Sequence, residues 1–504
     1  MDFLSLFVLV PLLTIVGILL TKEGQMVRRV SAVGMGVQLT LAAVLVIRYL
    51  LERHGGNTEQ WLFTADHLWF KSLNIHYAVG VDGISVAMVA LTAMVIFAGI
   101  FASWEVDSLP KEFFTSLILL SSGVFGFFIS LDMFTMFLFY ELAVIPMYLL
   151  IGIWGSGPKE YSAMKLTIML MGGSALLLVG LLGLYFNSTA GGGPPTFNFT
   201  EIAKIHLPVQ VQRFFFPFTF IGFGVLGALF PLHTWSPDGH SSAPTAVSML
   251  HAGVLMKLGG YGCFRIAIFL MPEAAQQMAW IFIILTTISI VYGAFGALMQ
   301  KDLKYINAYS SVSHCGIVLF ALLMFNQTAM TGAIIQMVSH GLMTALFFAL
   351  IGMIYSRTHT RIIDEMGGLM KVIPFLSAAY VIAGLASLGL PGFSGFVAEM
   401  TVFVGAFRHT DTFHRIVTII ATTSIVITAV YILRVVGILL LGPIKNEHYQ
   451  HLGEAHWYER LSTVTLIFGI TAIGLAPLWL SRMIGFSLGP VIEKLTALPV
   501  AGLF

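Results

Sequence analysis

Three ionisable side chains stand inside long apolar runs of this sequence. Glu141 lies in FLFYELAVIPMYLL (137–150), Lys257 in LHAGVLMKLGGYG and Glu399 in GFVAEMTVF. A charge at the centre of a membrane-spanning helix costs roughly 2.5 to 3.5 kcal/mol on insertion scales, so such residues usually have a partner or a use. The three positions therefore predict groups that gain and lose protons, or carry Na⁺, at membrane depth. The alternative is a merely structural ion pair.

Histidines and hydroxyls extend this polar pattern. Gln336, His340 and Thr344 recur every four residues, and Ser310 and His314 are also four residues apart. On a helix this spacing places each set on one face, where it can hold a chain of water molecules. The alternative for either helix is a set of satisfied structural groups.

His251 and Lys165 are two further candidates for proton transfer, but their spacing does not place them on the same helix faces. His251 precedes Lys257 by six residues, which is about 120° around a helix of 3.6 residues per turn, so the two need not face the same water. Lys165, in YSAMKLTIM, stands near the predicted cytoplasmic end of its span. It could simply extend its ammonium group to the membrane interface.

Composition indicates which elements must position these residues. The 504 residues are 58% hydrophobic and 10% charged, with mean hydropathy +0.91, which predicts an integral membrane protein. Apolar runs recur along the whole chain and predict an all-α polytopic protein with about fourteen transmembrane helices. Their centres lie near Leu12, Leu41, Thr92, Ser122, Val144, Gly173, Phe223, Lys257, Thr287, Ser313, Thr344, Ser387, Ile425 and Ile470.

Two of these spans contain prolines that predict broken helices. Pro231 follows span seven in FPLHTWSPDGH, and Pro391 stands between glycines of span twelve in LGLPGFSGF. Proline removes a backbone hydrogen bond and clashes with the preceding turn. Because the two spans would cross the bilayer in opposite directions, they indicate a transport site near the midplane. Two ordinary prolines in tolerant helices are the alternative.

Other classes of function find no support in the sequence. The net charge of +1, without a dense basic cluster, gives no indication of nucleic-acid binding. Cys263 and Cys315 fall in or near spans and predict packing residues, with no metal site. GFGVLG (222–227) lies inside an apolar helix and predicts close helix packing, not nucleotide binding. We identify no catalytic triad, phosphate loop or redox-centre motif. Lys22, Arg28 and Arg29 follow the first span, which argues against a cleavable signal peptide.

Six motifs together resemble the antiporter-like subunits of respiratory complex I and its relatives, over about residues 80–440. They are FYELAVIPMYLLIGIWG, FPLHTWSPDGHSSAPTAVSML, HAGVLMKLGGYG, DLKYINAYSSVSHCG, QMVSHGLMTALFF and LPGFSGFVAEM. The carboxylate Glu399 resembles the M-type subunit (chain M, subunit 4), since the other types usually carry lysine there.

The resemblance implies an arrangement and a role. It implies two inverted five-helix repeats, with N-terminal helices in 1–110, the repeats in 111–272 and 273–441, and a loop and final helix in 442–504. Glu141 would belong to the entry half of a proton channel, Lys257 would be central and Glu399 would lie toward the exit. The chain would carry no cofactor. Flavin, iron–sulfur clusters and quinone would belong to partner subunits of an NADH:quinone oxidoreductase, with L-type and N-type neighbours in an inner, energy-transducing membrane.

One position departs from the family pattern and leaves alternatives open. The family usually has a lysine five residues before the proline of P-L-H, where this chain has Leu226. Either another group, such as Lys165 or His233, modulates Glu141, or this copy pumps weakly in a variant complex. Two other functions remain: a subunit of a cation/proton antiporter, membrane-bound hydrogenase or inorganic-carbon-uptake complex, and a structural spacer.

Overall fold

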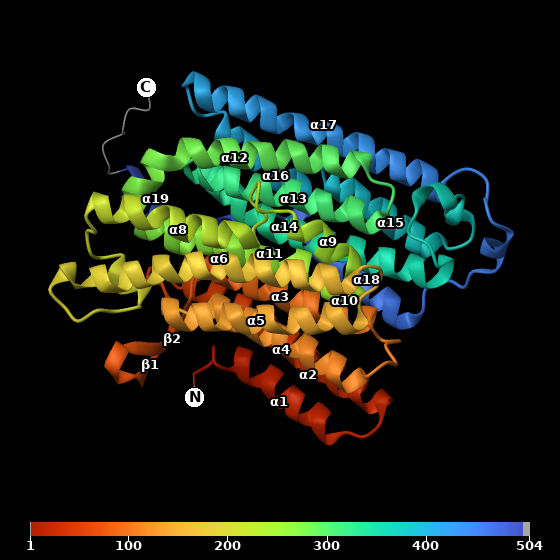
Figure 1. Ribbon diagram of the computed structural model, residues 1–504, viewed down its shortest axis with the longest axis horizontal. Helices are drawn as coiled ribbons and strands as arrows, with labels where there is room; N and C mark the ends of the chain where they lie inside the picture. Colours follow the sequence, from red (N-terminus) through yellow and green to blue (C-terminus); the bar gives the residue numbers. More distant parts are fainter. Residues whose placement is uncertain (1, 497–504) are drawn as a thin grey trace.

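The computed structural model describes residues 2–496, which form a bundle of long helices with one small β-hairpin. Figure 1 shows the long helices running side by side in roughly one direction, with α1 and α2 at one edge and α17 at the other. The elements are α1 (Leu6–Leu20), α2 (Gly24–His54), β1 (Leu62–Phe70), η1 (Lys71–Leu73), β2 (Ile75–Val81), α3 (Gly83–Ala102), α4 (Pro110–Ile129), α5 (Met133–Trp154), α6 (Lys159–Asn187), η2 (Ser188–Gly191), α7 (Phe199–Ile202), α8 (Val209–Leu226), α9 (Trp235–Ser242), α10 (Thr245–Leu250), η3 (His251–Leu255), α11 (Met256–Gly262), η4 (Cys263–Ile268), α12 (Pro272–Met299), α13 (Leu303–Leu322), α14 (Gln327–Thr358), η5 (Ile363–Glu365), η6 (Leu369–Lys371), α15 (Pro374–Ser387), α16 (Ser394–Ala406), α17 (Thr412–Leu440), η7 (Glu447–His451), α18 (Trp457–Leu475) and α19 (Leu478–Thr496).

The described helices fit a membrane protein of many spans. Ten are long and apolar enough to cross a bilayer, and α18 with α19 adds an eleventh candidate that bends by 76°. The apolar helices α1, α15 and α16 are shorter. Every span centre predicted from the sequence falls within a helix. The predicted total of about fourteen spans stays a prediction, because it counts broken and short helices as complete crossings.

One segment departs from the expected all-helical chain. Strands β1 and β2 pair antiparallel, with Leu62 opposite Val81 and Ala65 opposite Val79. The connection passes through η1 to Asn74, whose φ of 50° lies in the left-handed region that asparagine tolerates. This hairpin fills a stretch that the sequence analysis left without a span.

The packing of α4 on α5 recurs in α12 on α13. A Cβ atom on Gly123 would lie 2.7 Å from the backbone nitrogen of Ala143, and one on Gly293 would lie 2.6 Å from that of Ser313. Both residues of the second pair stand 170 positions after those of the first. Only glycine allows backbones to approach so closely.

The starts of α5 and α13 correspond at the same offset. Asp132 caps α5 by accepting a hydrogen bond from the backbone of Thr135, and Asp302 caps α13 by accepting one from Lys304. Each aspartate also forms an isolated β-bridge: Asp132 pairs with Asn198, which follows α6, and Asp302 pairs with Ile362, which follows α14. These matches support an internal repeat. The predicted inverted repeats and domain limits stay predictions, although residues 110, 272 and 441 all lie at helix ends.

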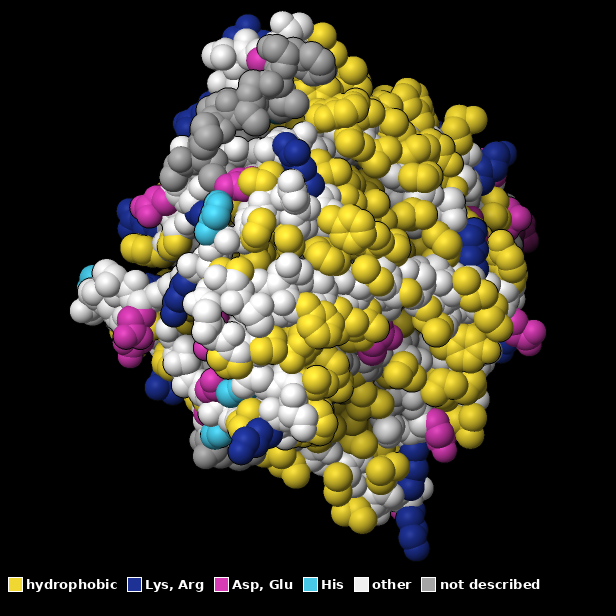
Figure 2. Space-filling view, turned by 60° about the vertical axis from the view of Figure 1, so that its left-hand side comes forward, with side chains coloured by type: hydrophobic (Ala, Val, Ile, Leu, Met, Phe, Trp, Pro, Cys, Tyr) yellow, Lys and Arg dark blue, Asp and Glu magenta, His cyan; other side chains and the backbone are white. Residues whose placement is uncertain are grey.

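The long helices with the largest buried share are α14, α13 and α3, so the core of the bundle lies around them. Most residues of these helices are buried, whereas α2 and α17 expose many apolar side chains. Figure 2 shows hydrophobic side chains spread across one face, with most charged side chains toward its edges. Such a surface suits lipid or neighbouring apolar subunits, because large exposed apolar areas are unfavourable in water.

The predicted packing role of GFGVLG is confirmed. Gly222 of α8 faces α6 so closely that a Cβ there would lie 2.8 Å from the backbone nitrogen of Leu177 and 3.0 Å from the carbonyl oxygen of Gly173. Cys263 and Cys315 are buried free thiols, as expected of packing residues.

Candidate functional site

Both predicted helix breaks are present and carry the predicted prolines. Pro231 lies between α8 and α9, and Pro391 lies between α15 and α16. At the second break Gly389 and Gly392 adopt φ of +66° and +99°, which glycine accepts without steric cost. A Cβ on Gly389 would lie 3.2 Å from Oε2 of Glu399. The break therefore brings backbone against the buried carboxylate.

Lys257 lies in a helix that changes its winding. The span runs through α10, the π-helical η3, α11 and the π-helical η4. The Lys257 ammonium donates to the carbonyl oxygen of Ala252 in η3 and lies 2.8 Å from Nδ1 of His340. Isolated π-helical turns are rare and often mark functional sites. Here the π-helical turn supplies a partner to a buried cation that forms no ion pair with a carboxylate within residues 2–496.

A continuous polar cluster leads from Lys257 to Glu399. The rings of His340 and His314 stack with centroids 5.0 Å apart. Nδ1 of His314 lies 3.4 Å from Oε1 of Glu399 and 3.0 Å from Nε2 of Gln336. All of these side chains are buried. The structure thus joins residues from α11, α13, α14 and α16 that are up to 142 positions apart, from Lys257 to Glu399.

Hydroxyl groups continue the same face toward the end of α14. Thr344 Oγ1 lies 3.1 Å from Ser311 Oγ and accepts a hydrogen bond from Asn307. Ser310 accepts one from Tyr431 of α17. The contacts of Gln336, His340 and Thr344 with α11 and α13 agree with the common helix face that their spacing predicts.

Two buried histidines form a second cluster between the first break and Lys257. The rings of His240 and His251 lie 4.2 Å apart, and His251 stacks on Trp235 at 5.1 Å. Within residues 2–496, none of their four ring nitrogens has a hydrogen-bond partner. Buried polar atoms of this kind are ordinarily satisfied by water, so the pair suits a hydrated path. The sequence analysis identified His251 but missed His240.

Lys165 has a partner that sequence reasoning missed. Its ammonium lies 2.7 Å from Oδ2 of Asp238 in α9, and Tyr305 donates to Oδ1 of the same carboxylate. Lys165 therefore has an ionic partner inside the protein, which its position near the end of a span did not predict. The hypothesis that Lys165 acts on Glu141 is not supported by a direct contact, since its ion pair is with Asp238.

Glu141 is half-buried in α5, and its Oε1 has no hydrogen-bond partner in the described part of the chain. Leu226 is fully buried among apolar residues. His233, the other suggested modulator, packs against Phe230 and Tyr292 with ring centroids 5.6 and 5.0 Å away. The structure therefore leaves Glu141 without the cationic partner that the family pattern places at position 226.

Two cations that sequence reasoning missed, Lys304 and Arg361, lie at the C-terminal end of α9. Lys304, buried at the start of α13, donates to the carbonyl oxygen of Ala243 at 2.6 Å. Arg361 donates to the carbonyl oxygen of Ser241 at 2.8 Å. Both cations thus stabilise the negative end of α9. Lys304 is the second residue of α13 and follows the capping Asp302 closely. Charged residues at the start of a helix are usually exposed, so nothing in the sequence indicates that Lys304 is buried.

We expect Asp238→Asn and Lys165→Met to be non-additive. Each change removes the same ion pair, so the double variant should lose no more activity than the more damaging single variant. The measurement is the proton-translocation rate of the native assembly in membrane vesicles for wild type, both single variants and the double. Losses that multiply would show that Lys165 and Asp238 act separately.

Comparisons with known proteins identify the family of this chain. Residues 130–428 match the family model described as NADH:quinone oxidoreductase/Mrp antiporter, TM, a region that includes Glu141, Lys257 and Glu399. The chain belongs to this family. Among its relatives, NADH-quinone oxidoreductase subunit M of Rickettsia conorii is 32% identical over 97% of this chain and 99% of the relative. NAD(P)H-quinone oxidoreductase chain 4 3 of Picosynechococcus sp. is 41% identical over 72% of this chain and 66% of that relative.

Solved structures of two kinds of complex share the fold. A chain of respiratory complex I from Thermus thermophilus with bound NADH superposes with a TM-score of 0.88 over 99% of this chain and all of its own length, at 24% identity. A chain of the Mrp complex from Dietzia sp. reaches 0.83 over 98% of each chain, at 20% identity. This family member is thus a multi-span membrane protein with the antiporter-like subunit fold. The solved chains that share this fold are parts of multi-subunit complexes.

Proposed function

We propose that this chain is a proton-translocating membrane-arm subunit of a complex I-type NADH:quinone oxidoreductase. One observation carries the proposal: Lys257, His340, His314 and Glu399 form one buried cluster across four helices. A spacer would gain nothing from burying these groups, because each charge costs free energy at membrane depth.

The geometry suits stepwise movement of protons. Lys257 can pass a proton to Nδ1 of His340 along the 2.8 Å contact. Nδ1 of His314 faces Oε1 of Glu399 at 3.4 Å and can pass a proton to it when the Gln336 amide presents its oxygen, in place of its nitrogen, to that ring. The Nε2 atoms of both histidines have no protein partner within residues 2–496. Water beside the rings that bridges these two Nε2 atoms would complete the path. A charge arriving near Lys257 changes how tightly it holds its proton, since charges interact strongly in a low-dielectric interior.

The remaining assignments belong to the same proposal. Redox chemistry takes place on flavin, iron–sulfur clusters and quinone in partner subunits, and this chain carries no cofactor. L-type and N-type subunits are its neighbours in an inner, energy-transducing membrane. Glu141 loads protons without a lysine at position 226, and the Lys165–Asp238–Tyr305 network belongs to the same entry half. The chain contributes to a translocase only as part of that assembly.

Leu226 favours one alternative. Without the family lysine, the chain could serve an antiporter, hydrogenase or inorganic-carbon-uptake complex, where a different energy source drives the same path. Glu399 argues against the antiporter, because the corresponding subunits usually carry lysine there.

Co-purification separates these functions. The tagged protein is isolated from its native membrane in mild detergent, and its companions are identified by mass spectrometry. We expect quinone-site and NADH-dehydrogenase subunits together with L-type and N-type chains. Recovery of only hydrogenase, carbon-uptake or antiporter subunits would overturn the complex I assignment while leaving the proton path intact.

A further inference from the structure

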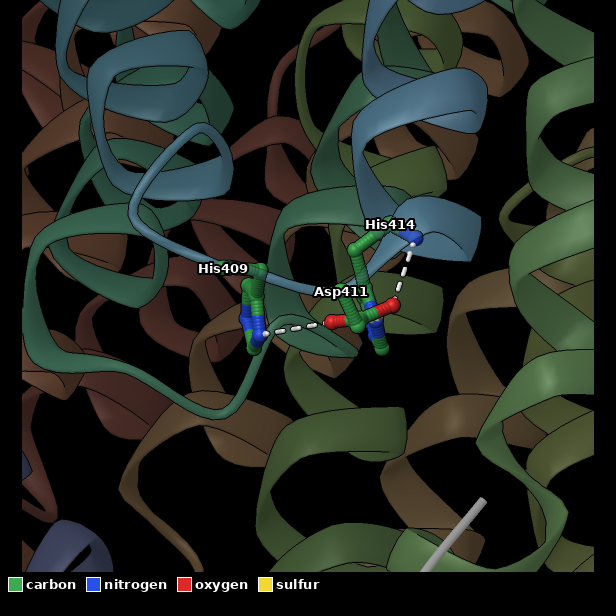
Figure 3. A group of neighbouring side chains, drawn as sticks. All are labelled: His409, Asp411 and His414. Carbon is green, nitrogen blue, oxygen red and sulfur yellow. Dashed lines mark hydrogen bonds and ion pairs between the residues drawn. The ribbon is translucent and has the colours of Figure 1, made fainter. Parts of the chain in front are cut away.

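Three side chains with metal-binding atoms meet at the turn between α16 and α17. Figure 3 shows His409, Asp411 and His414 around one point, with both histidines facing the carboxylate. His414 Nδ1 lies 2.8 Å from Oδ1 and 2.9 Å from Oδ2 of Asp411, and His409 Nδ1 lies 3.9 Å from Oδ2. One potential ligand atom from each residue can be chosen so that all three lie within 4.8 Å of one another.

The second nitrogen of His409 fixes the role of the first. Nε2 lies 2.8 Å from the carbonyl oxygen of Met324. A carbonyl oxygen can only accept, so the proton of the neutral ring resides on Nε2 and the lone pair of Nδ1 faces Asp411. Histidine ligands in metal sites typically donate their other N–H to a carbonyl or carboxylate in this way. His409 is therefore oriented as a ligand before any ion arrives.

We propose that His409, Asp411 and His414 form a binding site for a divalent cation of the Zn²⁺ class. Two imidazole nitrogens and one carboxylate oxygen are ligands that Zn²⁺ prefers, and a water molecule would complete a tetrahedron. At metal–ligand distances of about 2.0 to 2.1 Å, tetrahedral ligands lie about 3.3 Å apart. The observed separations of 2.8 and 3.9 Å bracket this value. The two imidazole rings are stacked, with centroids 4.2 Å apart and planes 13° from parallel, so at least one ring turns before both nitrogens face the same ion.

The backbone supports the same arrangement. Asp411 is the N-cap of α17 and accepts a hydrogen bond from the backbone nitrogen of His414 at 2.9 Å. This bond holds carboxylate and imidazole on one side of the first turn. The side chains of His409 and His414 are 27% and 12% exposed and that of Asp411 is 50% exposed. The site is thus built on ordered backbone and is open to water.

The location connects the site to the helices of the polar cluster. Glu399 stands seven residues before the end of α16, about 10 Å along a helix that rises 1.5 Å per residue. Asn326, the N-cap of α14, donates to the carbonyl oxygen of Gly405 at the end of α16. Met324, which holds His409, follows α13. A bound cation would fasten the end of α16 to α17 and, through His409, to the α13–α14 turn.

Cobalt provides a direct probe of this site. Co²⁺ in a tetrahedral nitrogen and oxygen environment absorbs visible light strongly, so titration of the purified full-length protein with Co²⁺ reports geometry as well as binding. We expect a saturable tetrahedral spectrum at one Co²⁺ per chain, which Zn²⁺ abolishes by competition. Zinc should also raise the thermal unfolding midpoint of the wild type, because binding stabilises the folded state.

Matched variants distinguish this site from other histidines. His409→Gln and Asp411→Asn should each weaken binding at least tenfold, and Asn keeps the N-cap of α17 so that folding is preserved. His448→Gln, at an exposed histidine outside the cluster, should bind as the wild type does. Equal binding by all four proteins, or no saturable tetrahedral spectrum, would overturn the proposal and leave His414–Asp411 as a helix-capping pair only. Neither outcome affects the proposed proton path.

Discussion

Replacing Lys257 with Met is expected to leave the assembly intact and to lower proton translocation at least about tenfold, since positioned proton-transfer groups contribute about 10²- to 10⁴-fold to rates. Methionine has a similar length and suits a buried site, but it cannot bind a proton or contact His340 and Ala252 as the ammonium does. The measurement is acidification of inverted membrane vesicles on addition of NADH, with subunit content verified by mass spectrometry.

The matched control is Lys371→Met, which removes an exposed lysine outside the cluster. It should pump as the wild type does, because an exposed charge contributes little. Normal pumping by an assembled Lys257→Met complex would favour the structural-spacer function.

Glu399→Gln is expected to lower the number of protons translocated per electron. The amide has nearly the shape of the carboxylate and can keep the 3.4 Å approach to His314, but it cannot take up and release a proton. Packing at the second break should therefore survive while transfer stops. The readout is the ratio of protons moved to NADH oxidised in reconstituted vesicles, which isolates this step from changes in turnover.

Glu112→Gln, at an exposed residue of α4, tests for effects of losing a carboxylate in general and should keep the wild-type ratio. If Glu399→Gln also keeps that ratio, Glu399 is not an exit group and the end of the path lies elsewhere.

The sequence was sufficient to find the groups that make the polar cluster. Lys257 and Glu399 stand out because a charge within an apolar run is costly wherever the run spans a membrane. His340 and His314 followed from four-residue spacing on their helices. Their mutual contacts were not predictable in the same way, since Lys257 and His340 are 83 positions apart.

Groups beside the first break were missed for a different reason. Asp238 and His240 belong to SPDGH, which reads as a polar turn and gives no sign that α9 continues at depth. The partner of Asp238, Lys165, is 73 positions away. Only the folded chain shows that the segment after a break can carry buried charge.

The sequence analysis also did not predict the π-helical winding of η3 or the pairing of β1 with β2. The 120° separation of His251 and Lys257 assumed 3.6 residues per turn, whereas η3 between them is π-helical. Hydrophobicity does not distinguish the two windings. For the β-hairpin a signal existed: aromatic and β-branched residues on both sides of KSLN, with Asn74 suited to the turn. Both strands are too short to cross a membrane as helices, so hydropathy averaged over the length of a span does not detect them.

The central claim is that Lys257 and Glu399 act on one proton path. The most direct test is the number of protons moved per electron in reconstituted complexes that carry Lys257→Met, Glu399→Gln or both. One path predicts that the double variant loses no more than the more damaging single variant, because a path blocked once is not blocked further. Losses that add in the double variant, or wild-type ratios in all three, would contradict the account.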